Sequence, residues 1–140
     1  SLLVYTGINR ESKKVLEDQN SQQAFEIKHY LKEIGQKIQL TFIDGDLDAF
    51  GRLMNEHWRF KKETSGMISN PEFDQIYSLA MKNGCLGGKI IGAGGGGYFL
   101  FYCGNQETKN ATKSAMENAG FRSIPFEIDY KGTRVVEVQV

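Results

Sequence analysis

The sequence predicts an α+β fold in which helices pack on one side of an antiparallel, ferredoxin-like sheet. The expected elements follow the order strand, several helices, two strands, helix, two strands, which is typical of such a sandwich. The longer expected helices each carry one apolar stripe, so each has a single face to bury. The chain has 140 residues and contains no linker or internal repeat, so residues 1–140 are expected to form one domain.

The amino-terminal part is expected to begin with one strand and two helices. Residues 2–6 form a short apolar run that Gly7 ends, which favours a buried strand. Asn9 is a suitable N-cap for a polar helix over residues 10–19. A longer amphipathic helix, about 20 residues in length, follows from Ser21 onward. Its apolar positions, at steps of three and four, are Ala24, Ile27, Leu31, Ile34 and Ile38.

An acidic break precedes the next expected helix. Asp44, Asp46 and Asp48 resemble the opening of a calcium loop. Such a loop needs glycine at its sixth position and a bidentate acid at its twelfth, where this chain has Ala49 and Asn55. The sequence therefore favours Asp46 as a helix cap over a calcium site. The inward side chains expected of this helix are Leu47, Phe50, Leu53, Met54, His57 and Trp58.

The second half of the chain alternates helices with pairs of strands. Pro71 begins a helix, since its missing N–H does no harm in a first turn, and Gly84 ends that helix. The later elements are expected as strands over residues 88–92 and 98–103, a helix over 106–118, and strands over 121–130 and 134–140 joined by a turn at 131–132. The inward residues expected of the two helices are Phe73, Ile76, Tyr77, Leu79 and Ala80, then Ala111, Ala115, Met116 and Ala119.

The composition excludes several classes of function. Seventeen basic and 17 acidic residues cancel, which argues against a nucleic-acid binder or a membrane-surface protein. The longest apolar run has six or seven residues, too few to span a membrane. Cys85 and Cys103 lack a C-x-x-C spacing or a histidine partner, which favours two reduced thiols in a cytoplasmic protein and no metal site. The chain begins at Ser1 directly before a strand, which suggests that it was cut from a longer one.

Residues 84–97, GCLGGKIIGAGGGG, hold eight of the 16 glycines. A G-x-G-x-x-G spacing occurs within them, but an aromatic strand follows where a dinucleotide site needs a helix. Tyr98 and Phe99 stand where a P-loop needs Lys-Ser/Thr. Two interpretations remain: a hairpin whose glycines permit tight packing, or a loop whose bare backbone approaches a phosphate. Lys89 could supply that phosphate with a fixed charge, or it could be a solvated edge residue.

The glycine segment and its surroundings resemble the GHMP kinases, a family that includes galactokinase, homoserine kinase, mevalonate kinase and phosphomevalonate kinase. Residues 89–97, KIIGAGGGG, look like the third motif of that family. The heptose 7-phosphate kinase group within it looks most similar. The segments that carry the resemblance are Tyr5-Thr6-Gly7-Ile8-x-Arg10, Met54-Asn55-x-His57, Trp58-x-x-Lys61, Ile68-Ser69-Asn70-Pro71, the helix Glu72–Asn83 and Gly88-Lys89.

This resemblance implies the carboxy-terminal domain of an ATP-dependent sugar kinase. The family's ATP-binding loop, P-x-x-x-G-L-G-S-S-A, and its acidic base lie in an amino-terminal domain, so no catalytic residue is expected within these residues. ATP and Mg²⁺ would be bound mainly by that other domain of the same polypeptide, which would be this chain's partner together with a sugar or sugar phosphate. The phosphate- or substrate-binding residues implied here are Lys89, Gly92, Gly94, Gly95, Gly96, Gly97, Lys61 and Arg10.

Other interpretations stay open beside the kinase. Lys61 and Arg10 could equally be solvated surface charges, and Trp58 is expected in the core before any sugar-binding role. No chemistry is assigned to His29 or His57, although the family pattern places a residue at the substrate cleft where His57 stands. The chain could also be a stand-alone small-molecule binding or regulatory module, or a structural domain that completes a partner chain.

Overall fold

In the residues that it describes, the computed structural model contains one four-stranded antiparallel sheet and four helices of 12 or more residues. It describes residues 1–8, 13, 17, 22–66, 68–92 and 94–132. The strand order is β2-β3-β1-β4, and every neighbouring pair is antiparallel. This confirms the predicted α+β, ferredoxin-like architecture. The elements are β1 (Leu2–Tyr5), α2 (Gln22–Asp44), α3 (Leu47–Glu63), α4 (Pro71–Lys82), β2 (Gly87–Ile90), β3 (Tyr98–Tyr102), α5 (Gln106–Asn118) and β4 (Ser123–Ile124).

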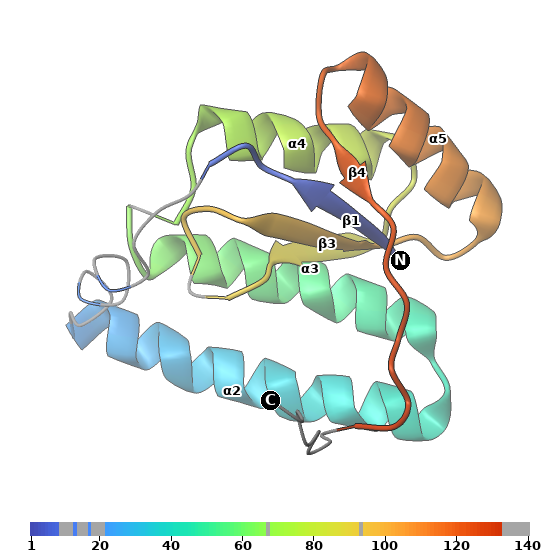
Figure 1. Ribbon diagram of the computed structural model, residues 1–140. Coiled ribbons are helices and arrows are strands. Elements are labelled where there is room, and N and C mark those ends of the chain that lie inside the picture. The colour runs from blue at the N-terminus through green and yellow to red at the C-terminus, as the bar shows by residue number, and fades with distance from the viewer. Residues whose placement is uncertain (9–12, 14–16, 18–21, 67, 93, 133–140) are drawn as a thin grey trace, which may run out of the picture.

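One face of the sheet forms the core. The register pairs Leu2 with Phe101 and Val4 with Phe99, so alternate residues of the two central strands point to the same side. Helix α4 covers this face, and the ring of its Phe73 lies edge-on to Phe99, with the centroids 5.9 Å apart. Figure 1 shows α4 beside β1 and α5 beside β4. The buried core is Leu2, Val4, Trp58, Ile68, Phe73, Ile76, Ala80, Cys85, Ile90, Phe99, Phe101, Cys103 and Met116.

Helices α2 and α3 form an antiparallel hairpin that flanks the edge strand β2 (Figure 1). The turn between them contains Gly45 at φ +72°, and Asp46 caps α3 by accepting a hydrogen bond of 2.8 Å from the backbone N–H of Ala49. The capping role predicted for Asp46 is confirmed. Trp58 of α3 reaches into the core, where its ring is edge-on to Phe99 at 5.1 Å.

Three sequence expectations differ from the structure. Leu47, expected to point inward, is 44% exposed, because it is the first residue of α3 and lies beyond the packed part of the helix. Ala111 of α5 and its C-cap Ala119 are exposed, and Thr112 is buried, as Met116 is, because the buried side of α5 lies about one position away from the predicted stripe. The strand predicted over residues 121–130 is wrong beyond its start. It pairs only at Ser123 and Ile124, because Pro125 has no N–H to continue the ladder.

Other expectations fall outside the part that is described. They are the N-cap Asn9, most of the helix over residues 10–19 with Arg10 in it, and the last strand over 134–140. Among the described helices, none is long and apolar enough to cross a membrane.

Candidate functional site

The last part of the glycine segment, Gly92–Gly97, lies in the hairpin loop that joins β2 to β3. Four of its glycines have positive φ: Gly92 at +94°, Gly94 at +100°, Gly95 at +76° and Gly97 at +91°. Other L-residues rarely adopt this conformation, so the backbone path itself requires glycine at these positions. The loop presents main chain where other residue types would place side chains.

The end of β1 holds the carboxy-terminal end of this loop. The N–H and the hydroxyl of Thr6 both donate to the carbonyl oxygen of Gly97, each at 2.9 Å. The N–H of Gly97 donates in turn to the carbonyl oxygen of Ile8 at 2.8 Å. Thr6 is completely buried, so water does not compete for these bonds. The loop is therefore fixed against a segment that lies about ninety residues earlier in the chain.

A cavity of about 170 Å³ lies at the amino-terminal end of the loop, where β2 meets the hairpin of α2 and α3. It brings together four of the predicted site residues, namely Lys61 of α3, Lys89 of β2, and Gly92 and Gly94 of the loop. None of its described lining residues is acidic. The complete lining is Leu31, His57, Trp58, Lys61, Lys89, Ile90, Gly92 and Gly94.

Positive charge is concentrated at this cavity. Burial lowers the pKa of Lys89. Burial also lowers the pKa of Lys61, and repulsion from Lys28 and Lys89 lowers it further. Both ammonium groups are thus less well solvated than on an open surface, and an anion placed between them would favour their charged forms.

His57 and Trp58 bring two further polar groups to the same place. His57 Nδ1 and Trp58 Nε1 are buried and have no hydrogen-bond partner in the described part of the chain. A buried polar atom left unpaired costs about 1–3 kcal/mol, so its presence calls for a reason. Both residues line the cationic cavity, which links their unmet hydrogen bonds to the candidate site.

The cavity predicts a pH dependence of stability through His57. Burial first, then repulsion from Lys89 and Lys61, lowers the pKa of His57 from 6.5 to about 4. Between these values the unfolded chain binds a proton that the folded chain does not, so stability falls as the pH drops from about 6.5 toward 4. Urea unfolding at pH 7 and pH 5 is expected to show a smaller loss in His57→Gln than in the wild type. His29→Gln, which changes an exposed histidine of α2, should lose stability on acidification as the wild type does.

The remaining predicted residues lie apart from the cavity lining. Gly95 is buried in the loop, and Gly96 and Gly97 continue the loop toward β3. Arg10 lies outside the described residues. Sequence reasoning assigned no chemistry to His57. His57 and Lys61 are four residues apart in α3, so their side chains lie on the same face of the helix, and this spacing could have indicated that His57 belongs to the site.

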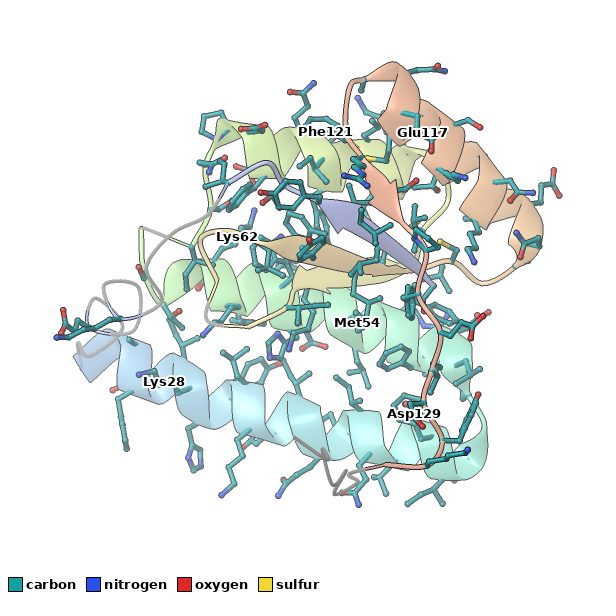
Figure 2. All side chains as sticks on the ribbon, viewed as in Figure 1. Lys28, Met54, Lys62, Glu117, Phe121 and Asp129 are labelled. Carbon is teal, nitrogen blue, oxygen red and sulfur yellow. The ribbon has the colours of Figure 1, made fainter. Side chains whose placement is uncertain are left out.

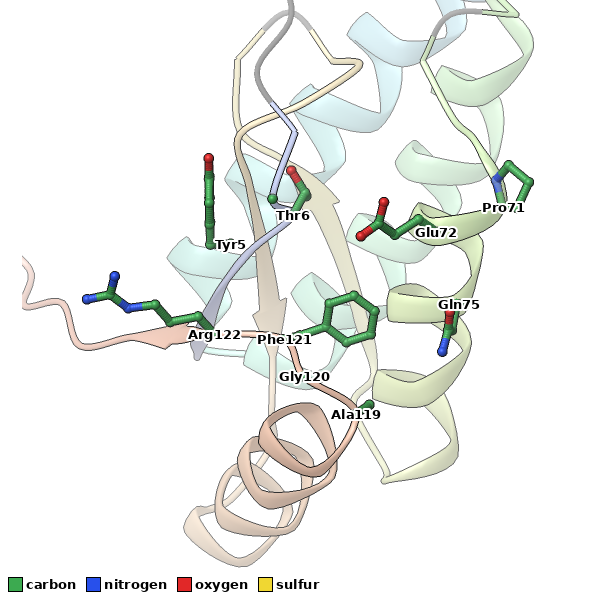
Figure 3. A pocket seen from close by; sticks show the side chains of 10 residues that line it. Tyr5, Thr6, Pro71, Glu72, Gln75, Ala119, Gly120, Phe121 and Arg122 are labelled. Atoms are coloured by element: carbon green, nitrogen blue, oxygen red, sulfur yellow. The ribbon is translucent and has the colours of Figure 1, made fainter.

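A larger groove, of about 560 Å³, lies at the end of β1 (Figure 3). Tyr5 and Arg122 stand on one side of it and Glu72 and Gln75 on the other, with Phe121 between them. The charged side chains Arg122 and Glu72 lie on opposite walls and have opposite signs, so the groove does not favour a ligand of one charge. The cationic cavity is the stronger candidate for a binding site.

The two cysteines, 18 residues apart in sequence, meet in the core. Their Sγ atoms are 3.5 Å apart, and Cys85 Sγ also lies 3.3 Å from the hydroxyl of Thr112. The hydrogen bond with Cys103 lowers the pKa of Cys85 to about 7 and raises that of Cys103. The sequence did not predict this proximity, because it depends on the pairing of the segments around β2 and β3.

Comparison with known proteins gives a consistent result. Residues 20–122 match the sequence family described as GHMP kinases C terminal. The chain is 30% identical over 125 residues to D-glycero-alpha-D-manno-heptose 7-phosphate kinase of Campylobacter jejuni, covering 86% of this chain and 37% of that protein. It is 35% identical over 76 residues to a galactokinase of Candida parapsilosis, covering 53% of this chain and 15% of that protein.

Solved structures share the fold. The L. major mevalonate kinase superimposes with a TM-score of 0.76 at 24% identity, covering 84% of this chain and 37% of that one. The chain therefore spans less than two fifths of the length of each of these three relatives.

Proposed function

The chain belongs to the GHMP kinases through their carboxy-terminal domain, and from this membership we propose that the whole protein transfers the γ-phosphoryl group of ATP to a sugar hydroxyl. The observation that carries the proposal is the cationic cavity beside a loop of positive-φ glycines. Phosphoryl transfer depends on positioning and on stabilisation of negative charge more than on covalent chemistry by the protein. Fixed cations and bare main chain are suited to that task.

Within this proposal, residues 1–140 form the acceptor-side domain. The Gly92–Gly97 loop would lie against the ATP loop of an amino-terminal domain of the same polypeptide and would shape the region between nucleotide and acceptor. We assign no catalytic base to the present chain. ATP and Mg²⁺ would be held mainly by the other domain, where the ATP-binding loop of this family lies. We also propose a cytoplasmic location, where Cys85 and Cys103 would stay reduced.

The acceptor class follows from the similarity to sugar kinases. The heptose 7-phosphate kinase of C. jejuni matches most of this chain, and galactokinase matches about half of it. We propose a free or phosphorylated sugar as the acceptor. The mevalonate kinase structure, at 24% identity, supports the fold alone.

The test compares the 140-residue chain with the protein encoded together with the sequence upstream of Ser1. The longer protein is expected to consume ATP with one member of a panel of sugars and sugar phosphates. The chain alone is expected to give no turnover, because it contains no ATP-binding loop of the family type. Turnover by the isolated chain would contradict the assignment of ATP binding to the other domain. A start codon directly at Ser1 would instead favour a stand-alone binding module.

A further inference from the structure

We propose that Thr6 is a positioning residue for phosphoryl transfer, because its hydroxyl holds the Gly92–Gly97 loop in the path that the reaction requires. This inference rests on the proposed function for the identity of the reaction. The holding of the loop rests only on the contacts of Thr6. The side chain of Thr6 is completely buried, so it touches neither nucleotide nor acceptor and acts through Gly97.

The hydroxyl of Thr6 joins the end of β1 to the loop through a short network of hydrogen bonds. It donates to the carbonyl oxygen of Gly97 at 2.9 Å and accepts from the N–H of Ile8 at 3.3 Å. The carbonyl oxygen of Ile8 accepts in turn from the N–H of Gly97 at 2.8 Å. Figure 3 shows Thr6 at the end of β1, where this network lies. Removal of the hydroxyl alone therefore weakens the restraint on both polar groups of Gly97.

The direction of the Gly97 carbonyl bears on the proposed role of the loop. Backbone N–H groups attract an anion, and a carbonyl oxygen, which carries partial negative charge, repels one. Gly97 has φ +91° and no side chain, so little within the residue itself hinders rotation of its peptide group. The N–H and the hydroxyl of Thr6 both donate to this carbonyl at 2.9 Å, so the oxygen is not free to turn toward a phosphate.

Two other contacts limit the position of the loop. The N–H of Ile91 donates to the carbonyl oxygen of Tyr98 at 2.9 Å, which closes the hairpin at its base. Gly94 lies so close to Ile68 that an added Cβ would be 3.3 Å from the isoleucine side chain. A hydrocarbon side chain limits how near the main chain comes but does not set the direction of a peptide group. The hydroxyl of Thr6 adds this directional restraint.

Two substitutions of Thr6 separate the hydroxyl from the shape of the side chain. Thr6→Val keeps the branched shape and removes the hydroxyl, whereas Thr6→Ser keeps the hydroxyl and removes a buried methyl group. If Thr6 only filled the core, valine would be the better replacement, because buried apolar volume stabilises a protein. If the hydroxyl positions the loop, serine is the better replacement for activity.

Steady-state kinetics of the full-length enzyme measure the effect on the reaction. In Thr6→Val, kcat and kcat/KM are expected to fall alike by about tenfold or more, because a small displacement of the loop misplaces the reacting groups without removing a binding contact. The KM values should therefore stay unchanged. Thr6→Ser should restore most of the lost activity.

Amide hydrogen exchange of the 140-residue chain tests the holding of the loop without any reaction. In Thr6→Val, the Gly97 N–H is expected to exchange with solvent about tenfold faster or more, since the segment that accepts its hydrogen bond has lost its own restraint. Amides within α4 should keep their wild-type rates, which shows that the domain remains folded. Thr6→Ser should keep the wild-type rate at Gly97.

Thr112→Val serves as the matched control. Thr112 of α5 is also completely buried, and its hydroxyl lies 3.3 Å from Cys85 Sγ. Cys85 precedes β2, so it lies at the end of the β2–β3 pair opposite to the loop. In Figure 2, α5, which carries the labelled Glu117, is on the right and the loop is on the left. This substitution should change neither kcat nor exchange at Gly97.

Four results would overturn the proposal. They are wild-type kcat in Thr6→Val, a kcat in Thr6→Ser as low as in Thr6→Val, unchanged exchange at Gly97 in Thr6→Val, and an equal loss of activity in Thr112→Val. A full-length protein that transfers no phosphoryl group would reject the proposed function, and the role of Thr6 in transfer with it. The exchange rate at Gly97 would then show separately whether Thr6 holds the loop.

Discussion

Replacing Gly95 with valine in the full-length enzyme is expected to lower the rate of phosphoryl transfer by about a hundredfold or more while the protein stays folded. Gly95 is buried in the loop at φ +76°, where an L-residue is strained by about 1–3 kcal/mol. The loop can relieve this strain only by changing its path beside the cationic cavity. A displacement of about 1 Å is enough to cost about a hundredfold in rate. Steady-state kinetics together with circular dichroism measure the two parts of this prediction.

The matched control is Gly45→Val in the turn between α2 and α3. Gly45 has a similar φ of +72°, and an added Cβ would meet no heavy atom within 4 Å. Both variants should carry the strain of a side chain at positive φ, but only Gly95→Val should lose activity. Wild-type rates in Gly95→Val would remove the loop from the mechanism. Equal loss of activity in Gly45→Val would attribute the effect to general destabilisation.

The helices were predictable from local signals. Helix α4 begins at Pro71 and ends before Gly84, which has φ +92°, as the proline and glycine rules indicate. Helix α5 has the predicted bounds, 106–118. The strand predicted over 121–130 is too long, because the alternation continues past Pro125, which has no N–H to extend the ladder. Phe126, Ile128 and Tyr130 alternate as a strand would, yet all three are exposed.

The candidate site was predictable only in part. The glycine spacing and the family resemblance predict Lys61, Lys89 and the Gly92–Gly97 loop as site residues. The hydrophobic periodicity does not predict that the two lysines lie close together. They are 28 residues apart, and they meet because α3 lies against β2. That contact is a tertiary one, which no local pattern in the sequence specifies. The sequence favours a core position for Trp58 over a ligand-binding one. In the structure Trp58 is a core residue, only 1% exposed, and it also lines the cavity.

The contact between α3 and β2 depends on two glycines, Gly51 and Gly87, and for Gly87 the tight-packing interpretation of the glycine segment applies. A side chain on Gly87 of β2 would collide with the main chain of α3, and a side chain on Gly51 of α3 would collide with Leu86 and with Tyr102 of β3. A Cβ on Gly51 would lie 2.5 Å from the ring of Tyr102 and 2.8 Å from Cβ of Leu86. The short run Gly87-Gly88 thus serves close packing, while the glycines from Gly92 onward serve the conformation of the loop.

Gly87→Ala is therefore expected to destabilise the domain by about 3 kcal/mol or more, a large part of the 5–15 kcal/mol that is typical of a folded protein. The new Cβ would overlap the carbonyl oxygen of Gly51 and lie 2.6 Å from the backbone nitrogen of Asn55. These are main-chain atoms, so no rotamer change relieves the collision and α3 must move away from β2. Urea unfolding measures the loss.

The same substitution at Gly35 supplies the control, since Gly35 is exposed in α2 and has nothing within 4 Å of an added Cβ. Gly35→Ala should stabilise the protein by about 0.5–1 kcal/mol through helix propensity. If Gly87→Ala proved as stable as the wild type, α3 would not pack this closely on β2. Because the same packing sets the distance between Lys61 and Lys89, a smaller shift of α3 should also widen the cavity. In the full-length enzyme, Gly87→Ala is then expected to lower the rate of phosphoryl transfer under conditions where it remains folded, which ties the packing of the domain to its proposed site.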